Sequence, residues 1–352
     1  MKKNIFQYCG AIHIHTKFSD GTGDIQSISK AAKKAGLDWI IVTDHNSMEI
    51  EEGIFNGVYV IKAEEISPAG ENHYLAFGIK EVILPSDNPQ EYVDKVREYG
   101  GFGFAAHPDE GYTVDENGKI VPRKNSYHCI PWSDKSIKPD GVEIWNWFSN
   151  WADNLNDKTI FHLAYSYFFK HKTVKSPSKL TLDWWDKLNS ETAKIIPALG
   201  GVDAHALRTK DYLIPLTIFP YETCFKTVNN IINIREPLSK DFKEAKSQIL
   251  SAIKCGNNII INKKIQNYAP EVFINNDKDF AYCGEDIILT ENTNLNIRFC
   301  KKICIKIFLN GREIYKERTH KIILPIKETG KYRIEFLYKE KGFAYTNPIV
   351  VK

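Results

Sequence analysis

Histidines and acidic residues recur together in short motifs along this chain. One residue separates His13 from His15, and Asp20 follows them. Asp44 and His45 form an adjacent Asp-His pair. Motifs of the same kind supply the remaining candidate ligands, which are Glu65, His73, His107, Asp203 and His205. Imidazole and carboxylate groups are the ligands of hydrolytic metal sites. The sequence therefore predicts a site for several metal ions.

Most of these motifs follow a run of apolar, β-prone residues, which places them at the ends of strands. Residues 39–42 and 58–61 are two such runs. Side chains alternate along a strand with a period of two, so His13 and His15 share one face. The order of strand, polar tip and helix repeats as in parallel sheets covered by helices. Polar tips on many different strands favour a closed barrel over an open sheet.

The length favours one large domain and a small one, because single cores stop growing near about 250–300 residues. Residues 1–264 carry the α/β pattern and form the expected large domain. Within it, residues 147–184 are rich in aromatic side chains and are interpreted as a helical insertion near the barrel mouth, with the rings used for packing. An Asn-Gly pair at 310–311 predicts a tight hairpin. Residues 265–352 are accordingly expected to form a small β-sandwich accessory domain.

Composition and charge set further expectations. The formal net charge is only +3 over 352 residues, which gives no general nucleic-acid-binding surface, so nucleic acid is expected only as a short substrate. The 7 cysteines form no obvious disulfide framework and are interpreted as small buried residues in a reducing cytoplasm. Neither a signal-peptide core nor a membrane-length apolar run is present, so a cytoplasmic protein without a membrane partner is expected. The sequence sets no oligomeric state.

The motif set resembles that of the polymerase-and-histidinol-phosphatase (PHP) family of metallohydrolases. The resemblance is carried by residues 13–21, 43–45, 65–67, 106–108 and 201–205. It implies a distorted (β/α)7 barrel with a site for three divalent metal ions, which are zinc, manganese or iron. Segments in the second half of the chain resemble the carbaryl-hydrolase-like branch of that family, whose members often carry a C-terminal β domain. The aromatic insertion departs from a minimal PHP domain, so the resemblance does not extend to the substrate pocket.

Carried over residue by residue, the resemblance implies three sets of metal ligands. The first ion would be held by His13, His15, Glu65 and Asp203. The second would be held by Glu65, His73 and His107, with the glutamate bridging, and the third by Asp20, His45 and His205. Glu65 is preferred to Glu64 because an Ile-Ser pair follows it. Glu64 would then point the other way and form a structural hydrogen bond.

A cluster of cations favours the hydrolysis of a phosphoester. Adjacent ions lower the pKa of a bound water, which supplies hydroxide at neutral pH, and they stabilise an anionic transition state. The expected substrate is a small phosphoester such as a nucleotide or a sugar phosphate. Hydrolysis of a carbamate, amide or ester at the same site is the alternative. A non-catalytic binding protein ranks below both, because the chain keeps every ligand of the motif set.

Three further residues near the motifs are candidates for catalysis or substrate binding. Asp44 and Arg208 are the candidate catalytic residues. Asp44 would orient an imidazole, or would simply form a turn. Lys17 and Arg208 could bind a phosphate or carboxylate group, or could be solvated surface charges.

Overall fold

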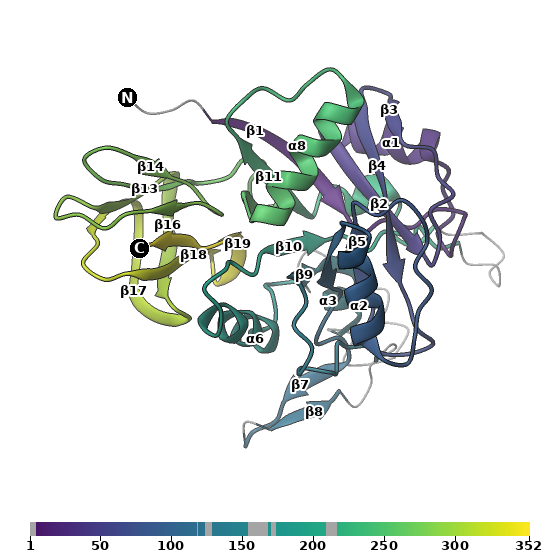
Figure 1. Cartoon of the computed structure of the whole chain (residues 1–352), viewed down its shortest axis with the longest axis horizontal. Coiled ribbons are helices and arrows are strands. Elements are labelled where there is room, and N and C mark those ends of the chain that lie inside the picture. Colours follow the sequence, from purple (N-terminus) through teal and green to yellow (C-terminus); the bar gives the residue numbers. More distant parts are fainter. Residues whose placement is uncertain (1–4, 118, 124–128, 154–167, 170–173, 209–216) are drawn as a thin grey trace.

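A computed structural model describes residues 5–117, 119–123, 129–153, 168–169, 174–208 and 217–352 of the chain (Figure 1). Its mixture of helices and strands confirms the expected α/β class. The helices are α1 (Ile25–Lys34), α2 (Pro89–Glu98), α3 (Trp147–Asp153), α6 (Lys179–Ser190), α7 (Tyr221–Cys224) and α8 (Phe242–Cys255). Among the described residues, no helix combines the length and apolar character needed to cross a membrane.

The strands divide into those of the motif-bearing region, which ends with β12, and those that follow it. The first group is β1 (Phe6–Ile12), β2 (Trp39–His45), β3 (Gly53–Phe55), β4 (Val58–Ile66), β5 (Tyr74–Phe77), β6 (Phe102–Ala105), β9 (Gly141–Asn146), β10 (Ala198–Gly201), β11 (Val228–Ile234) and β12 (Asn258–Asn262). A separate hairpin is formed by β7 (Tyr112–Val114) and β8 (Ile120–Pro122). The second group is β13 (Glu271–Asn275), β14 (Phe280–Ala281), β15 (Asp286–Ile287), β16 (Asn294–Leu309), β17 (Arg312–Pro325), β18 (Gly330–Tyr338), β19 (Lys341–Thr346) and β20 (Ile349–Val351).

Helix ends follow the local sequence. The side chain of Asp24 caps α1 by accepting a hydrogen bond of 2.8 Å from the backbone N–H of Ser27. Asn88 caps α2, in which Pro89 occupies the first turn, where its missing N–H costs nothing. Helix α8 ends at Gly256, whose φ of 76° is the left-handed conformation that glycine adopts without strain.

A ring of strand pairings brings the motif-bearing strand ends together. β1 pairs in parallel with β2, and β2 with β4. β6 pairs in parallel with β9, and β9 with β10. Beyond β10, Val202 N–H donates to the carbonyl of Ile12 at 3.0 Å, and His15 N–H donates to the carbonyl of Ala204 at 3.0 Å. The end of β10 therefore returns to the end of β1, and the carboxyl ends of the parallel strands surround one point.

Strand β5 differs from the parallel pattern expected for the motif strands. It pairs antiparallel with both β4 and β6. The connection from β4 to β5 spans only residues 67–73, which is too short for the helical crossover that a parallel connection needs. The reversal places His73, just before β5, at the same edge of the sheet as Glu65 near the end of β4.

The C-terminal strands form a β-rich region beside the motif-bearing strands (on the left in Figure 1). The expected hairpin turn at 310–311 joins β16 to β17, with φ of 49° at Asn310 and 80° at Gly311. Apolar side chains of this region gather in a core of their own that includes Leu295 and Phe336. The two regions are also joined directly, because β12 pairs antiparallel with β19.

The aromatic insertion expected at 147–184 is helical at both ends, in α3 and α6. Its residues 154–167 and 170–173 lie outside the described part of the chain. Trp147 is buried in the hydrophobic core, so this ring packs as expected.

The interpretation of all cysteines as buried residues is wrong. Cys224 and Cys283 are buried, but Cys129, Cys255 and Cys300 are exposed, and none forms a disulfide. A small side chain is tolerated at surface positions as well as in cores, so cysteine alone is a weak indicator of burial.

Candidate metal centre

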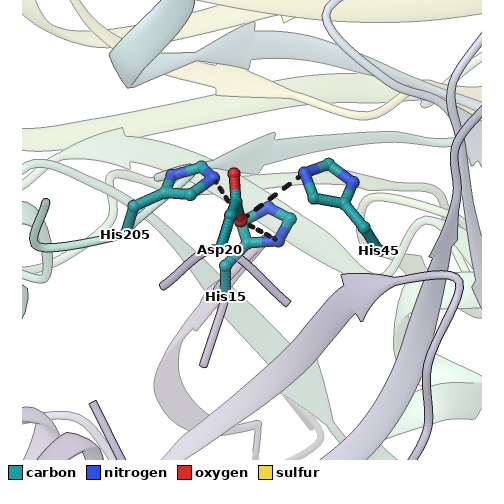
Figure 2. A group of neighbouring side chains, drawn as sticks. All are labelled: His15, Asp20, His45 and His205. Atoms are coloured by element: carbon teal, nitrogen blue, oxygen red, sulfur yellow. Dashed lines mark ion pairs between the residues drawn. The ribbon is translucent and has the colours of Figure 1, made fainter. Parts of the chain in front are cut away.

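The predicted ligands meet in one cluster at the carboxyl ends of the parallel strands. His13 and His15 follow β1, His45 ends β2, Glu65 lies near the end of β4, His73 precedes β5, His107 follows β6, and Asp203 and His205 follow β10. Figure 2 shows His15, His45 and His205 directed toward the carboxylate of Asp20. Side chains that are distant along the chain thus share one small volume.

Glu65 lies at the centre of the cluster and uses both of its oxygens. Its Oε2 is 3.1 Å from Nε2 of His13 and 3.3 Å from Nε2 of His15. Its Oε1 is 2.9 Å from Nδ1 of His73 and 3.2 Å from Nε2 of His107. The side chain is fully buried. Oε2 also lies 3.2 Å from Nδ1 of His45. Each oxygen of this carboxylate therefore faces its own group of imidazoles, which is the arrangement of a group that bridges two cations.

Asp203 completes the group around His13 and His15. Its Oδ1 is 3.2 Å from Nε2 of His15 and 3.6 Å from Nε2 of His13. The same oxygen is 3.4 Å from Nδ1 of His205. Asp203 thus connects the deepest imidazoles to those nearer the surface.

Asp20 gathers the outermost imidazoles around a single oxygen. Its Oδ1 is 3.2 Å from Nε2 of His205, 3.7 Å from Nε2 of His45 and 3.8 Å from Nδ1 of His15 (Figure 2). The side chain of Asp20 is 54% exposed, whereas that of His15 is fully buried. The cluster therefore opens to solvent on the Asp20 side.

The donor set and its spacing fit divalent cations. Nδ1 and Nε2 of His15 are both buried without a hydrogen-bond partner, which buried polar atoms rarely tolerate. Facing ligand atoms lie between 2.9 and 3.8 Å apart, and two ligands of one tetrahedral zinc ion lie about 3.3 Å apart. Nitrogen and oxygen donors without thiolate suit zinc, manganese or iron.

Interactions within the cluster shift the pKa values of its members. Burial alone would raise the pKa of Glu65, but His13 and the other imidazoles hold it well below its usual range. Partial burial would likewise raise the pKa of Asp20, but the hydrogen bond with His205 and the nearby imidazoles lower it to about 2. Burial, followed by the neighbouring His205 ring, lowers the pKa of His15 to about 3. Glu65 and Asp20 are thus ionised and His15 is neutral, which are the forms that bind metal. Burial alone would lower the pKa of His107 and His205, but the neighbouring carboxylates raise both to about 9, so these two imidazoles must release a proton when a metal binds.

Glu64 faces away from the cluster, as expected. Its Oε2 accepts a hydrogen bond of 2.9 Å from the backbone N–H of Ile83. Burial raises the pKa of Glu64 to about 7. Neighbouring residues on a strand point to opposite faces, so this contact leaves Glu65 directed into the cluster.

Asp44 contacts the loop that leads to Asp20, in line with the alternative that it forms a turn, and its catalytic role stays a prediction. Its Oδ1 accepts hydrogen bonds from the backbone N–H of Thr16 at 2.6 Å and from the hydroxyl of Ser19 at 2.7 Å. Its Oδ2 accepts one from the Thr16 hydroxyl at 2.7 Å. Both oxygens are occupied by the loop that leads to Asp20, so this buried carboxylate holds the loop in place. The spacing of an Asp-His pair gives no indication of such a contact.

Lys17 and Arg208 are both exposed. The Lys17 ammonium lies 5.6 Å from the centre of the Phe18 ring. Arg208 pairs through its backbone with Thr217 and adjoins residues 209–216, which lie outside the described part of the chain. Their roles toward a substrate stay predictions.

Two functional candidates were missed by sequence reasoning, and both lie on β9. Glu143 is 1% exposed, and Asn146 is 6% exposed. Both contact predicted ligands directly. The available signal was the presence of two polar residues within an otherwise apolar strand, Gly141–Asn146, whose end lies level with the other motifs.

The first part of the chain matches a known domain family. Residues 11–130 match the model of the PHP domain. The matched segment contains His13 through His107, and the motif around Asp203 lies beyond it. The match confirms the expected PHP domain in this segment, and the groups of the cluster could hold metal ions. The carbaryl-hydrolase-like branch stays a prediction.

Individual relatives are distant. An uncharacterised protein of Methanocaldococcus jannaschii is 29% identical over 144 residues, which cover 33% of this chain and 81% of the relative. Among solved structures, the chain resembles a two-domain protein containing a predicted PHP-like metal-dependent phosphoesterase from Bacteroides vulgatus, with 14% identity, coverage of 98% of this chain and 95% of that one, and a TM-score of 0.41. It also resembles endonuclease Q in complex with duplex DNA carrying an abasic lesion, with 15% identity, coverage of 71% and 57%, and a TM-score of 0.38.

Proposed function

We propose that the protein is a phosphoesterase of the PHP type, acting on a small phosphoester such as a nucleotide or a sugar phosphate. The observation that carries this proposal is the buried carboxylate of Glu65, which meets imidazoles on both of its oxygens within the segment that matches the PHP domain. A short nucleic-acid end would present the same phosphoester group to the site.

Three divalent ions, of zinc, manganese or iron, are proposed to occupy the cluster. The first set is His13, His15, Glu65 and Asp203, the second is Glu65, His73 and His107, and the third is Asp20, His45 and His205. Cations bound here would lower the pKa of a bound water and stabilise negative charge on the reacting group.

The protein's own side chains determine how a substrate reaches the cluster. The side chains of Asp20 and His45 are 54% and 28% exposed, whereas those of His13 and Glu65 are almost fully buried. The substrate therefore approaches from the Asp20 side, and the deeper groups stay shielded from bulk water. Lys17 lies on the loop before Asp20 and is proposed to bind anionic oxygens of the substrate, with Arg208 in the same role.

Hydrolysis of a carbamate, amide or ester is the second candidate function. The ring of Phe148 lies 5.9 Å from that of His205 and 5.8 Å from that of Trp151. An aromatic wall beside the outermost ligand group favours a planar, uncharged substrate. A non-catalytic binding role is weaker than either, because every predicted ligand is present in the cluster.

We further propose that the ring of strands β1, β2, β4, β5, β6, β9 and β10 is the distorted seven-stranded barrel of this family. The strands from β13 onward are proposed to form the accessory β-sandwich. The boundary is placed near residue 264, after β12.

A substrate screen with a matched inactive variant tests the proposal. Metal-loaded protein is assayed for release of phosphate from nucleotides and sugar phosphates, and for hydrolysis of aryl carbamates and esters in parallel. The double substitution His13→Ala with Asp203→Ala removes two ligands of the first set and is expected to abolish turnover. Phosphate release by the wild type but not by the double variant supports the proposal. Turnover of carbamates or esters without phosphate release supports the second candidate. Full activity in the double variant would refute the site.

A further inference from the structure

Three of the predicted ligands have backbone conformations that L-residues rarely adopt. The φ angles of His13, His107 and Asp203 are 68°, 28° and 51°. Such conformations are costly and persist only where surrounding contacts hold them. These same three residues offer ligand atoms within reach of one another as a single buried group. Contacts with surrounding residues must therefore hold these three segments in their strained conformations.

Glu143 contacts two of these three segments. Its Oε1 lies 2.8 Å from Nδ1 of His13, and its Oε2 accepts a hydrogen bond of 2.7 Å from the backbone N–H of His107. A carboxylate oxygen at this position can accept a hydrogen bond from Nδ1 of His13. Nε2 of His13 faces Glu65 and Asp203, which lie 3.1 and 3.6 Å away, and is the ring atom left to bind a metal when Nδ1 donates to Glu143.

Asn146 extends this contact to the third segment. Its Nδ2 donates to Oε2 of Glu143 at 3.1 Å and to Oδ2 of Asp203 at 3.2 Å. Its Oδ1 accepts a hydrogen bond of 2.9 Å from the backbone N–H of Ser149, which fixes the orientation of the amide. Asp203 Oδ2 is thereby held, and Oδ1 is left to face His15 at 3.2 Å.

Gly201 leaves the space that the contact between Glu143 and His13 occupies. A Cβ atom at position 201 would lie 1.7 Å from Oε1 of Glu143 and 2.9 Å from Cβ of His13. Any other residue at this position must displace one of those two side chains. The glycine on β10 is thus part of the same arrangement.

We propose that Glu143 and Asn146 are positioning residues that hold His13, His107 and Asp203 in their strained, metal-ready conformations. The inference rests on the proposed metal centre and adds residues that would act through the ligands without binding the metal. Its expected consequence is a change in metal affinity and geometry. A measurement of overall stability alone would not detect this change in metal binding.

The isosteric substitution Glu143→Gln tests the proposal. In glutamine only one of the two terminal atoms accepts hydrogen bonds. If the amide nitrogen faces His13, it places a donor opposite Nδ1 and disfavours the tautomer that donates from Nδ1. If it faces the other way, it places a donor opposite the N–H groups of His107 and Asn146. Glu64→Gln is the matched control, because Glu64 is equally buried and its side chain, within the described part of the chain, hydrogen-bonds only to the backbone N–H of Ile83. Gly201→Ala is a second variant that leaves every ligand and Glu143 in the sequence.

Metal affinity is measured by titrating the metal-free proteins with Zn²⁺, and geometry by the visible absorption spectrum of the Co²⁺-loaded forms. Glu143→Gln and Gly201→Ala are expected to bind the metal about 10- to 100-fold more weakly than the wild type, with altered Co²⁺ spectra. Glu64→Gln is expected to match the wild type in both measurements. Circular dichroism checks that each variant is folded, and if Glu143→Gln does not fold, Gly201→Ala decides the question.

Wild-type affinity and an unchanged spectrum in the folded variants overturn the proposal and leave the proposed function standing. A wild type that binds no divalent metal overturns both. Because the readout is metal binding, a wild type that binds metal but cleaves no phosphoester affects only the proposed function.

Discussion

At the scale of single residues, the loop that carries Asp20 depends on Asp44. Replacing Asp44 by Asn puts an amide donor opposite the donors of Thr16 and Ser19. The free energy of unfolding is expected to fall by about 1–3 kcal/mol, as for a buried donor that loses its acceptor. Urea denaturation measures the change, with Glu49→Gln, an exposed substitution on the following loop, as control. Equal stability of the two variants would contradict the role assigned to Asp44.

The outermost ligand group is expected to lose its ion separately from the others. His205 contacts Asp20 and Asp203 but has no contact with the deep pair of His73 and His107 within the described part of the chain. His205→Ala is therefore expected to lower the metal content by about one ion per chain while the remaining ions stay bound. Elemental analysis of the dialysed protein gives the number of metal ions per chain. Complete loss of metal would show that the three ligand sets do not bind their ions independently.

Single residues of the site differ in how far the sequence predicts them. Period-two spacing and strand-end placement are local properties, so the candidate ligands from His13 to His205 can be recognised in the sequence, whereas their division into three sets rests on the family resemblance. The partners of Asp44 and Glu143 depend on which loops and strands become neighbours in the fold. That information is not contained in the spacing of residues, so the sequence leaves the role of Asp44 open between orienting an imidazole and forming a turn, and it gives no role to Glu143.

At the scale of elements, strand ends were predictable and strand directions were less so. The apolar runs over residues 39–42 and 58–61 identified β2 and β4. The reversal of β5 follows from a short connection, and apolar periodicity is the same for parallel and antiparallel strands when both faces are buried. The contacts of α6 likewise depend on the distant strand β18.

Helix α6 is held at its C-terminal end by a buried lysine from β18. Lys331 donates from Nζ to the carbonyl oxygens of Asn189 and Thr192, each at 2.8 Å. Lys331→Met keeps the aliphatic stem but leaves these carbonyls without their partner and removes a positive charge from the helix end. The expected loss is about 1–3 kcal/mol of unfolding free energy, measured by urea denaturation. Lys327→Met, at an exposed position before the same strand, is the control, and an equal effect of both would argue against the capping role.

At the scale of the whole molecule, the two regions are less separable than the sequence indicated. Ile231 and Ile261, from β11 and β12, lie in the same hydrophobic core as Phe336 of β18. Asn347 accepts a hydrogen bond from the backbone N–H of Ala198 at 2.6 Å, at the start of the strand that leads to Asp203. The end of the α/β pattern suggested the boundary, whereas the register between β12 and β19 is a long-range feature that local alternation does not encode.

Residues 1–264 are therefore not expected to fold alone. Removal of residues 265–352 exposes the apolar faces of β11 and β12 and leaves β12 as an unpaired edge. The truncated chain is expected to aggregate or to lack a cooperative thermal transition, as seen by calorimetry. A soluble truncated form that unfolds cooperatively and binds metal would show that the C-terminal strands are dispensable.

The central claim is that cations occupy the cluster around Glu65. Anomalous diffraction from a crystal of the metal-loaded protein, collected at the absorption edge of the metal, locates such ions directly. The account predicts separate peaks, each about 2.0–2.3 Å from atoms of one ligand set, with Glu65 shared between two of them. Metal-loaded crystals with no anomalous peak between Glu65 and its surrounding imidazoles would contradict it.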